Sequence, residues 1–218
     1  MSAKLYYFYH RGAAELTRLT CVAAGIEYTE VNPETRSDFL KWIEEGKLLF
    51  KQIPMLEIDG RQIVQTRAII RYVARKGALL GKNADEETTV DMLFEGGRDF
   101  TTPSLAIGFR PEADVLSNVK NDIMPKYMPI FEKVAAENGT GYLVGDSLTI
   151  ADLSVLEGLL TFTEYFGKEI FEGFPALEKF FNKVTSLEKI SAYLKSPRRK
   201  KKNDEHCIAK VKEILGRN

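Results

Sequence analysis

The sequence predicts two units of different class, a small α/β domain followed by a larger all-helical domain. Short strand and helix patterns alternate over the first part of the chain. The periodicity then breaks at residues 76–83, which reads as a connecting segment. Beyond it the strand patterns vanish and helical periodicity continues to the end.

The first part is expected to contain a strand–helix–strand unit, followed by a β-hairpin and a helix. The expected strands are Lys4–Phe8, Glu27–Val31, Met55–Ile58 and Gln62–Val64, and the expected helices are Ala13–Ala24, Ser37–Glu45 and Thr66–Lys76. Gly25 caps the first helix, and Asp59-Gly60 supplies a two-residue hairpin turn. A βαβ unit joined to a ββα unit is the thioredoxin-like order. We therefore expect a thioredoxin-like domain over residues 1–79 and a linker over 80–84.

Residues 85–218 are expected to form the all-helical C-terminal domain. Its expected helices are Glu86–Phe109, Ala113–Glu137, one from Thr149 through Glu164, one opened by Pro175, Leu187–Leu194 and His206–Leu215. Thr149 and Asp152 have the spacing of a capping box, with Asp in the usual Glu position.

Composition narrows the class of protein. The 218 residues carry 31 basic and 31 acidic side chains, so no overall field favours nucleic acid or a membrane. No apolar run approaches the roughly 20 residues that span a bilayer, and the start of the chain lacks the pattern of a signal peptide. Cys21 and Cys207 lie far apart and make no disulfide framework or metal spacing. These features predict a cytoplasmic protein without a metal.

The segment around Pro54 is the most informative part of the chain. A proline is excluded from a sheet interior, so Pro54 directly before a strand marks a special bend. If the Ile53-Pro54 bond is cis, the N–H and C=O of Ile53 face outward and can pair with an extended peptide. Gln65-Thr66 then begins a helix, where free N–H groups and the dipole favour an anion. An open strand edge beside a helix start that can bind a carboxylate suits a small acidic peptide such as glutathione.

Motifs along the chain carry a resemblance to a known family. They are Lys4-Leu5-Tyr6-Tyr7-Phe8, Arg11-Gly12, Thr17-Arg18, Gln52-Ile53-Pro54-Met55, Gln65-Thr66-Arg67-Ala68-Ile69, Asp91-Met92, Glu95-Gly96, Asp99, Tyr142-Leu143-Val144-Gly145 and Ala151-Asp152. In this order and spacing the chain resembles the cytosolic glutathione transferases, most closely the alpha class, over nearly its whole length. The resemblance implies a homodimeric detoxification enzyme that conjugates the thiolate of reduced glutathione to hydrophobic electrophiles, with peroxidase or isomerase side activity.

The resemblance assigns the catalytic role to Tyr7, four positions before Arg11-Gly12. A phenol that donates to the glutathione sulfur favours the thiolate, which is the nucleophile. Arg11 would add positive potential near that sulfur. The strand alone leaves Tyr7 open as an ordinary aromatic strand residue. A thiol-based alternative fails, because the stretch that follows the first strand, through His10, contains no cysteine.

The resemblance also implies the glutathione contacts. Ile53, with Pro54, would pair with the cysteinyl backbone of glutathione, and Gln52 would assist. Gln65 and Thr66 would hold the γ-glutamyl carboxylate at the helix start.

Further expected glutathione contacts involve either a residue that differs from the alpha-class pattern or the glutathione bound to the partner subunit. Asp99 would reach the γ-glutamyl ammonium of the partner subunit's ligand. Ile43 stands where the alpha class has an arginine for the glycyl carboxylate, so Lys41 or Lys47 would substitute as a point charge. Lys126 matches an arginine that contacts the partner's glutathione.

The expected electrophile pocket is mostly apolar, which suits hydrophobic substrates. Its expected residues are Phe8, His10, Leu105, Ala106, Phe109, Ile208, Val211 and Leu215. His10 stands where the family usually has a small residue. It would narrow the pocket or donate to a polar substrate such as a lipid-derived carbonyl, or it is an exposed histidine at a turn.

The remaining predictions concern assembly and alternatives. Phe50 would insert between two helices of the partner, with Met92 and Phe131 lining the site that receives it.

The basic segment Pro197–Lys202 reads as a solvated loop, or as a nuclear address or a contact to an anionic surface. The fold alone also permits a non-catalytic ligand-binding, structural or interaction protein.

Overall fold

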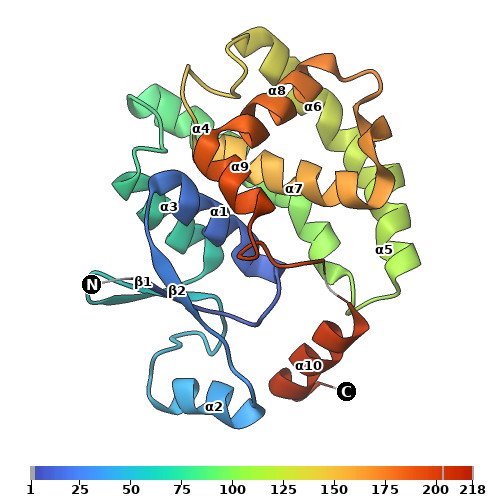
Figure 1. The fold of residues 1–218 in the computed structure, drawn as a ribbon. Coiled ribbons are helices and arrows are strands. Elements are labelled where there is room, and N and C mark those ends of the chain that lie inside the picture. The colour runs from blue at the N-terminus through green and yellow to red at the C-terminus, as the bar shows by residue number, and fades with distance from the viewer. Residues whose placement is uncertain (1–2, 203, 218) are drawn as a thin grey trace.

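A small sheet with its covering helices adjoins a bundle of longer helices (Figure 1) in the computed structural model. The structure describes residues 3–202 and 204–217, so Met1, Ser2, Asn203 and Asn218 lie outside the described residues. The first part contains β1 (Ala3–Tyr6), the 3-10 turn η1 (Gly12–Ala14), α1 (Glu15–Ala24), β2 (Tyr28–Val31), α2 (Arg36–Glu44), β3 (Met55–Ile58), β4 (Arg61–Val64) and α3 (Thr66–Lys76).

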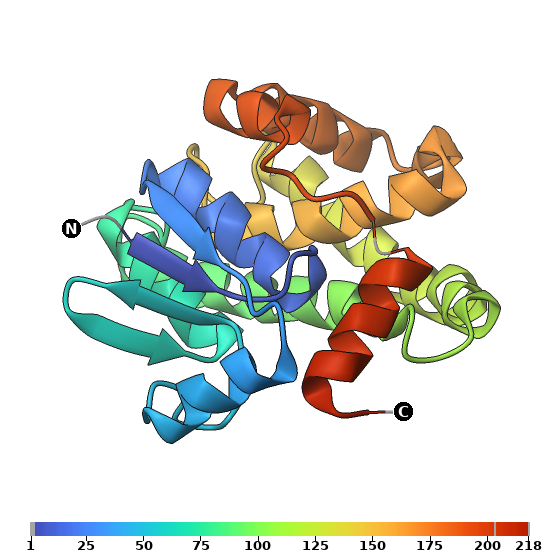
Figure 2. The same ribbon diagram turned by 60° about the horizontal axis from the view of Figure 1, so that its bottom comes forward.

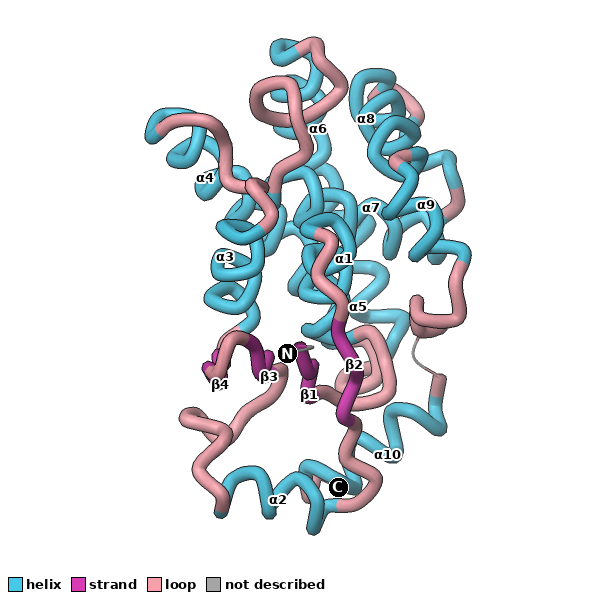
Figure 3. Tube along the Cα trace, turned by 60° about the vertical axis from the view of Figure 1, so that its left-hand side comes forward, coloured by secondary structure: helices cyan, strands magenta, loops and turns pink. Residues whose placement is uncertain are grey.

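Within the described residues the strands form one sheet in the order β2-β1-β3-β4. β1 runs parallel to β2 and antiparallel to β3, and β4 closes the sheet as the hairpin partner of β3. Helices α1 and α3 cover one face, while α2 lies across the other (Figure 3). Asp59 and Gly60 both have positive φ, 53° and 73°, as the expected two-residue hairpin turn requires. The predicted thioredoxin-like βαβ-ββα order is confirmed.

Among the described residues of the second part, the regular elements are all helical, joined by loops such as residues 139–149. It contains α4 (Ala84–Thr101), the 3-10 turn η2 (Thr102–Ala106), α5 (Glu112–Asn118), a π-helical turn (Val119–Ile123), α6 (Met124–Asn138), α7 (Ile150–Phe166), the 3-10 turn η4 (Lys168–Phe171), α8 (Pro175–Ser186), α9 (Glu188–Lys195) and α10 (Glu205–Leu215). Ala84, expected in the linker, is already the first residue of α4.

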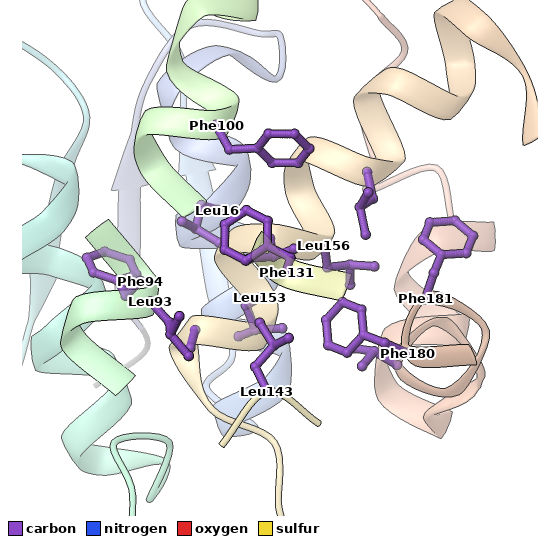
Figure 4. Close-up of a cluster of buried hydrophobic side chains, with 14 of the residues drawn as sticks. Leu16, Leu93, Phe94, Phe100, Phe131, Leu143, Leu153, Leu156, Phe180 and Phe181 are labelled. Carbon is purple, nitrogen blue, oxygen red and sulfur yellow. The ribbon is translucent and has the colours of Figure 1, made fainter. Parts of the chain in front are cut away.

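Helix α7 is the centre of the larger core, where Leu153 and Leu156 pack among Phe100 and Phe131 (Figure 4). A Cβ on Gly97 of α4 would lie 2.5 Å from the Ser154 hydroxyl of α7. The missing side chain therefore lets α4 and α7 approach closely.

The start of α7 is fixed by a buried carboxylate. Asp152 accepts hydrogen bonds from the backbone N–H groups of Thr149 and Leu143, each at 2.7 Å. The predicted capping box is confirmed, and it also ties the preceding loop to the helix.

Two predicted helices differ from the structure. The helix expected to run to Phe109 ends at Thr101, because Pro103 has no N–H to continue the α-helical hydrogen bonding. The second long helix extends from Glu112 to Asn138 but contains the π-helical turn. That turn ends at Ile123, two residues before Pro125, whose ring and missing N–H do not fit the preceding α-helical turn.

The last helix, α10, packs mainly on the first domain, against α2, while Ile208 near its start contacts the turn at Gly108 of the helical domain (Figure 2). Val211 and Ile214 are buried in the same apolar cluster as the sheet. The Nη1 of Arg36 on α2 donates to the carbonyl of Ile214 at 3.1 Å. The predicted stripe named Leu215 in place of Ile214, whose burial the structure reveals. In the described part of the chain, none of the helices is both long and apolar enough for a membrane span.

Candidate active site

Tyr7 lies directly after β1, with its hydroxyl turned toward the start of α1. Its Oη accepts a hydrogen bond from the Ala13 N–H at 2.8 Å, and its side chain is 6% exposed. Burial raises the pKa of Tyr7 to about 12, so the phenol keeps its proton at neutral pH. A Cβ on Gly12, which has φ +42°, would lie 2.4 Å from Oη. Gly12 therefore lets the turn pass beside the hydroxyl, which remains able to donate.

His10 is buried against Tyr7, so its interpretation as an exposed turn residue is wrong. Its ring stacks on Phe8 at a centroid distance of 5.6 Å and meets Tyr7 edge-on at 5.5 Å. Its Nδ1 has no hydrogen-bond partner among the described residues. Burial, with the charge of Arg18, lowers the pKa of His10 to about 4. The side chain is therefore a neutral wall beside the phenol.

Arg18 is a buried charged residue beside Tyr7 to which the sequence interpretation assigned no role. It is fully buried on α1, and its Cζ lies 5.9 Å from the Tyr7 ring centroid. It pairs with Glu30 at 2.9 Å and with Glu15 at 3.3 Å. These carboxylates hold the pKa of Arg18 above its ordinary value against the opposing effect of burial. The available signal was an arginine between apolar residues of a buried helix.

Arg11 has a different environment from the one expected. Its guanidinium forms an ion pair with Glu164 of α7 and donates to the carbonyl of Lys200. The positive charge of Arg11, which was expected to act on the glutathione sulfur, is therefore offset by the carboxylate of Glu164. This ion pair also joins the first domain to α7.

The start of α3, at Gln65 and Thr66, is joined to Tyr7 by hydrogen bonds, and the bend at Ile53-Pro54 has the expected geometry. The Ile53-Pro54 peptide bond is cis, as the interpretation of the bend required. Gln65 has φ 71° directly before α3, and its Nε2 donates to Oε1 of Gln52 at 3.4 Å. The hydroxyl of Thr66 donates to the Ala13 carbonyl at 3.3 Å. The Ala13 residue therefore connects the helix start at Thr66 to the Tyr7 hydroxyl.

Four expected glutathione contacts lie apart from this group. Lys41 and Lys47 both pair with Glu45, at 3.9 Å and 2.7 Å. Asp99 is exposed on α4, 4.0 Å from the Arg67 guanidinium. The Nζ of Lys126 lies 4.8 Å from the ring centroid of Tyr127.

A cavity of about 60 Å³ opens beside Gly12, between the first domain and the helices. Its charged lining consists of Arg11, Glu15, Glu157, Glu164 and Lys202. Its hydroxyl groups come from Thr101, Ser104, Thr161 and Tyr165, and its aliphatic residues are Leu105 and Ile107. The lining thus combines apolar surface with charged and hydroxyl groups that the sequence did not predict.

Of the predicted electrophile residues, Leu105 lines this cavity. Ala106 faces another pocket, with Arg110 and Val115, because η2 turns it away. Phe109 is partly exposed, and Phe8 packs in the core beside His10.

The α10 residues of the predicted pocket also lie elsewhere. Ile208 packs onto the turn at Gly108, while Val211 and Leu215 pack on the first domain. They fail to form an apolar wall of the cavity because α10 docks on the sheet domain.

The expected dimer residues separate into two groups. Phe50 and Met92 are 56% and 67% exposed, so both are available to a partner. Phe131 is 1% exposed and packs against Phe100 at a centroid distance of 5.5 Å. The prediction that Phe131 offers a surface to a partner is therefore wrong, because its own core covers it.

Comparisons with known proteins match both parts of the chain. Residues 3–75 match the family model of the glutathione S-transferase N-terminal domain, and residues 98–197 match that of the C-terminal domain. The chain is 38% identical over 217 residues to glutathione S-transferase A1 of Homo sapiens, covering 97% of each chain. It is 36% identical over 215 residues to glutathione S-transferase alpha-5 of Rattus norvegicus, again covering 97% of each.

Solved structures agree with this match. The monomeric glutathione S-transferase Na-GST-3 of Necator americanus has a TM-score of 0.79 at 33% identity, covering 90% of this chain and 98% of that one. A Nu-class enzyme of Haemonchus contortus has a TM-score of 0.76 at 37% identity, covering 89% and 96%. Family models, full-length relatives and fold together show that the chain belongs to the glutathione S-transferase family.

Proposed function

We propose that this protein is a glutathione transferase that conjugates the glutathione thiolate to electrophiles, in the detoxification of xenobiotics. The observation that carries the proposal is the connection made by Ala13. Its N–H donates to Tyr7 and its carbonyl accepts from Thr66. A proton donor for sulfur and an anion-binding helix start are thereby held in one rigid group, as binding and activating one peptide thiol requires.

In this mechanism the first domain binds and orients glutathione. The outward N–H and C=O of Ile53, beside cis Pro54, pair with its cysteinyl backbone. Gln65 and the N–H groups at the start of α3 hold its γ-glutamyl carboxylate, because the dipole of α3 favours an anion there. Gln52 orients the Gln65 amide. Lys41 or Lys47 supplies charge for the glycyl carboxylate after leaving Glu45.

Tyr7 then stabilises the reactive form of the thiol. The thiol proton passes to solvent, and the protonated phenol donates to the resulting thiolate. The thiolate attacks the electrophilic carbon, forming an S–C bond. With an aryl halide the halide leaves with the bonding pair. With an enone the π pair moves to the carbonyl oxygen, and the enolate takes a proton from water. Reduction of organic hydroperoxides or isomerisation of a double bond would use the same thiolate.

Retention on immobilised glutathione and turnover of 1-chloro-2,4-dinitrobenzene test the proposal together. We expect both. Retention without turnover would favour the non-catalytic ligand-binding alternative, and failure of both would overturn the glutathione site.

We further propose that the chain forms a homodimer through Phe50 and Met92, with Asp99 reaching the partner's glutathione. Phe50 is exposed directly beside the exposed Leu49, and neighbouring exposed apolar side chains are typical of an interaction surface. Phe50→Ser should raise the dimer dissociation constant at least about tenfold, since burying an aromatic side chain contributes several kcal/mol. Sedimentation at micromolar concentration measures this, with Leu40→Ser on α2 as the matched control. A Phe50→Ser protein that sediments and reacts like the wild type contradicts the interface.

The division into a glutathione-binding domain, residues 1–79, and an electrophile-binding domain, residues 85–218, is part of the same proposal. The two clusters of buried apolar residues support it. The cytoplasmic location stays a prediction, which imaging of the tagged full-length chain tests.

A further inference from the structure

The electrophile pocket beside Gly12 contains charges that an apolar substrate would not use. Each acidic group of its lining has a basic partner. Glu164 pairs with Arg11 and Arg199, Glu157 pairs with Arg98, and Glu15 pairs with Arg18. The carboxylates are therefore neutralised from within the fold.

Lys202 is a basic residue of the lining that, unlike the acidic ones, has no oppositely charged partner among the described residues. It lines the pocket, and among the described residues no carboxylate lies within ion-pair distance of its ammonium group. Its Nζ lies 4.7 Å from the ring centroid of Tyr165, another residue of the lining. Among the charged residues of the lining, Lys202 is thus the one without an ion-pair partner among the described residues, and its charge is positive.

The basic segment Pro197–Lys202 holds Lys202 in this place. Arg199 pairs with Glu164 at 2.7 Å, and Lys200 pairs with Glu30 at 3.5 Å. The carbonyl of Lys200 accepts from Arg11. These contacts fasten the segment to both domains through Arg199 and Lys200, which are half-buried, while its other four residues are exposed as expected of a solvated loop.

We propose that the enzyme prefers electrophiles that carry a carboxylate, which the Lys202 ammonium binds while the reactive carbon lies near Tyr7. The inference rests on the proposed function and adds a substrate class to it. For an enone carboxylate, the glutathione thiolate adds to the β-carbon and the π pair moves to the carbonyl oxygen. Water then protonates the enolate, and the carboxylate remains unchanged throughout. A cation at the pocket also offsets the repulsion between the two anionic reactants.

Two electrophiles that differ in charge but hardly in size test the proposal. One is benzylideneacetone with a para-carboxylate, and the other is the same enone with a para-carboxamide. The ratio of kcat/KM for the carboxylate over the carboxamide is measured for the wild type, Lys202→Gln and Lys201→Gln. Because the ratio is compared between enzymes, the intrinsic reactivities of the two enones cancel. Lys201 is the matched control, an exposed lysine of the same segment outside the lining.

We expect Lys202→Gln to lower the ratio about three- to fivefold, the upper part of the range for one exposed charge pair. The effect should shrink at 1 M salt, and Lys201→Gln should change the ratio less than about twofold. An unchanged ratio in Lys202→Gln overturns the inference. So does an equal fall in both variants, because it would report the general field of the segment. Turnover of 1-chloro-2,4-dinitrobenzene by the same preparations keeps the two proposals separate, since its absence in the wild type refutes the transferase function itself.

Discussion

Replacing Tyr7 with Phe removes one hydroxyl from the proposed site and leaves the ring packing in place. The phenol is protonated at neutral pH, because burial raises its pKa to about 12. A hydrogen bond to a charged group contributes about 1.5–3 kcal/mol. Because 1.36 kcal/mol corresponds to one pKa unit, the pKa of the bound glutathione thiol should rise by about 1–2 units. At a pH below the pKa of the wild-type bound thiol, the thiolate fraction, and with it kcat/KM, should fall about 10–100-fold.

The dependence of kcat/KM on pH, measured with 1-chloro-2,4-dinitrobenzene, separates this mechanism from general damage to the site. The Tyr7→Phe profile should shift to higher pH and approach the wild type once the thiol is fully ionised. Tyr9→Phe is the matched control, since Tyr9 is 66% exposed. Glutathione affinity should change little. An unshifted profile, or an equal loss of rate at every pH, would refute the role of the hydroxyl.

Three further predictions concern stability, measured by urea unfolding. Burial lowers the pKa of His10 to about 4 from about 6.5 in the unfolded chain, so stability is lost as pH falls from 6.5 toward 4. Between pH 7.5 and 5 the wild type should lose about 2 kcal/mol more than His10→Ala, and equal losses would contradict the buried neutral histidine. Asp152→Ala should cost about 2–4 kcal/mol, because the N–H groups of Thr149 and Leu143 lose a buried acceptor; wild-type stability would exclude that role. Ile214→Ala should cost about 2–4 kcal/mol, whereas a cost below about 1 kcal/mol would mean that α10 packs loosely on the first domain.

Much of the fold could be predicted because its signals are local. Pro54 before a strand marked the bend, and Asp59-Gly60 marked the hairpin. The capping box at Thr149 and Asp152 marked the start of the most buried helix. In each case the hydrogen bonds or backbone angles concern residues within a few positions of each other, so the sequence pattern states them directly.

The sequence by itself determined the order of elements, the family resemblance and the identity of Tyr7 as the candidate phenol. Only the tertiary structure decided that His10 is buried, that Arg11 pairs with Glu164, and that α10 packs on the sheet domain. It also decided that Lys202, at the end of the basic segment, lines the cavity beside Gly12. The physical reason is sequence separation. Arg11 and Glu164 lie 153 positions apart, and an ion pair over such a distance depends on which surfaces of the folded domains meet.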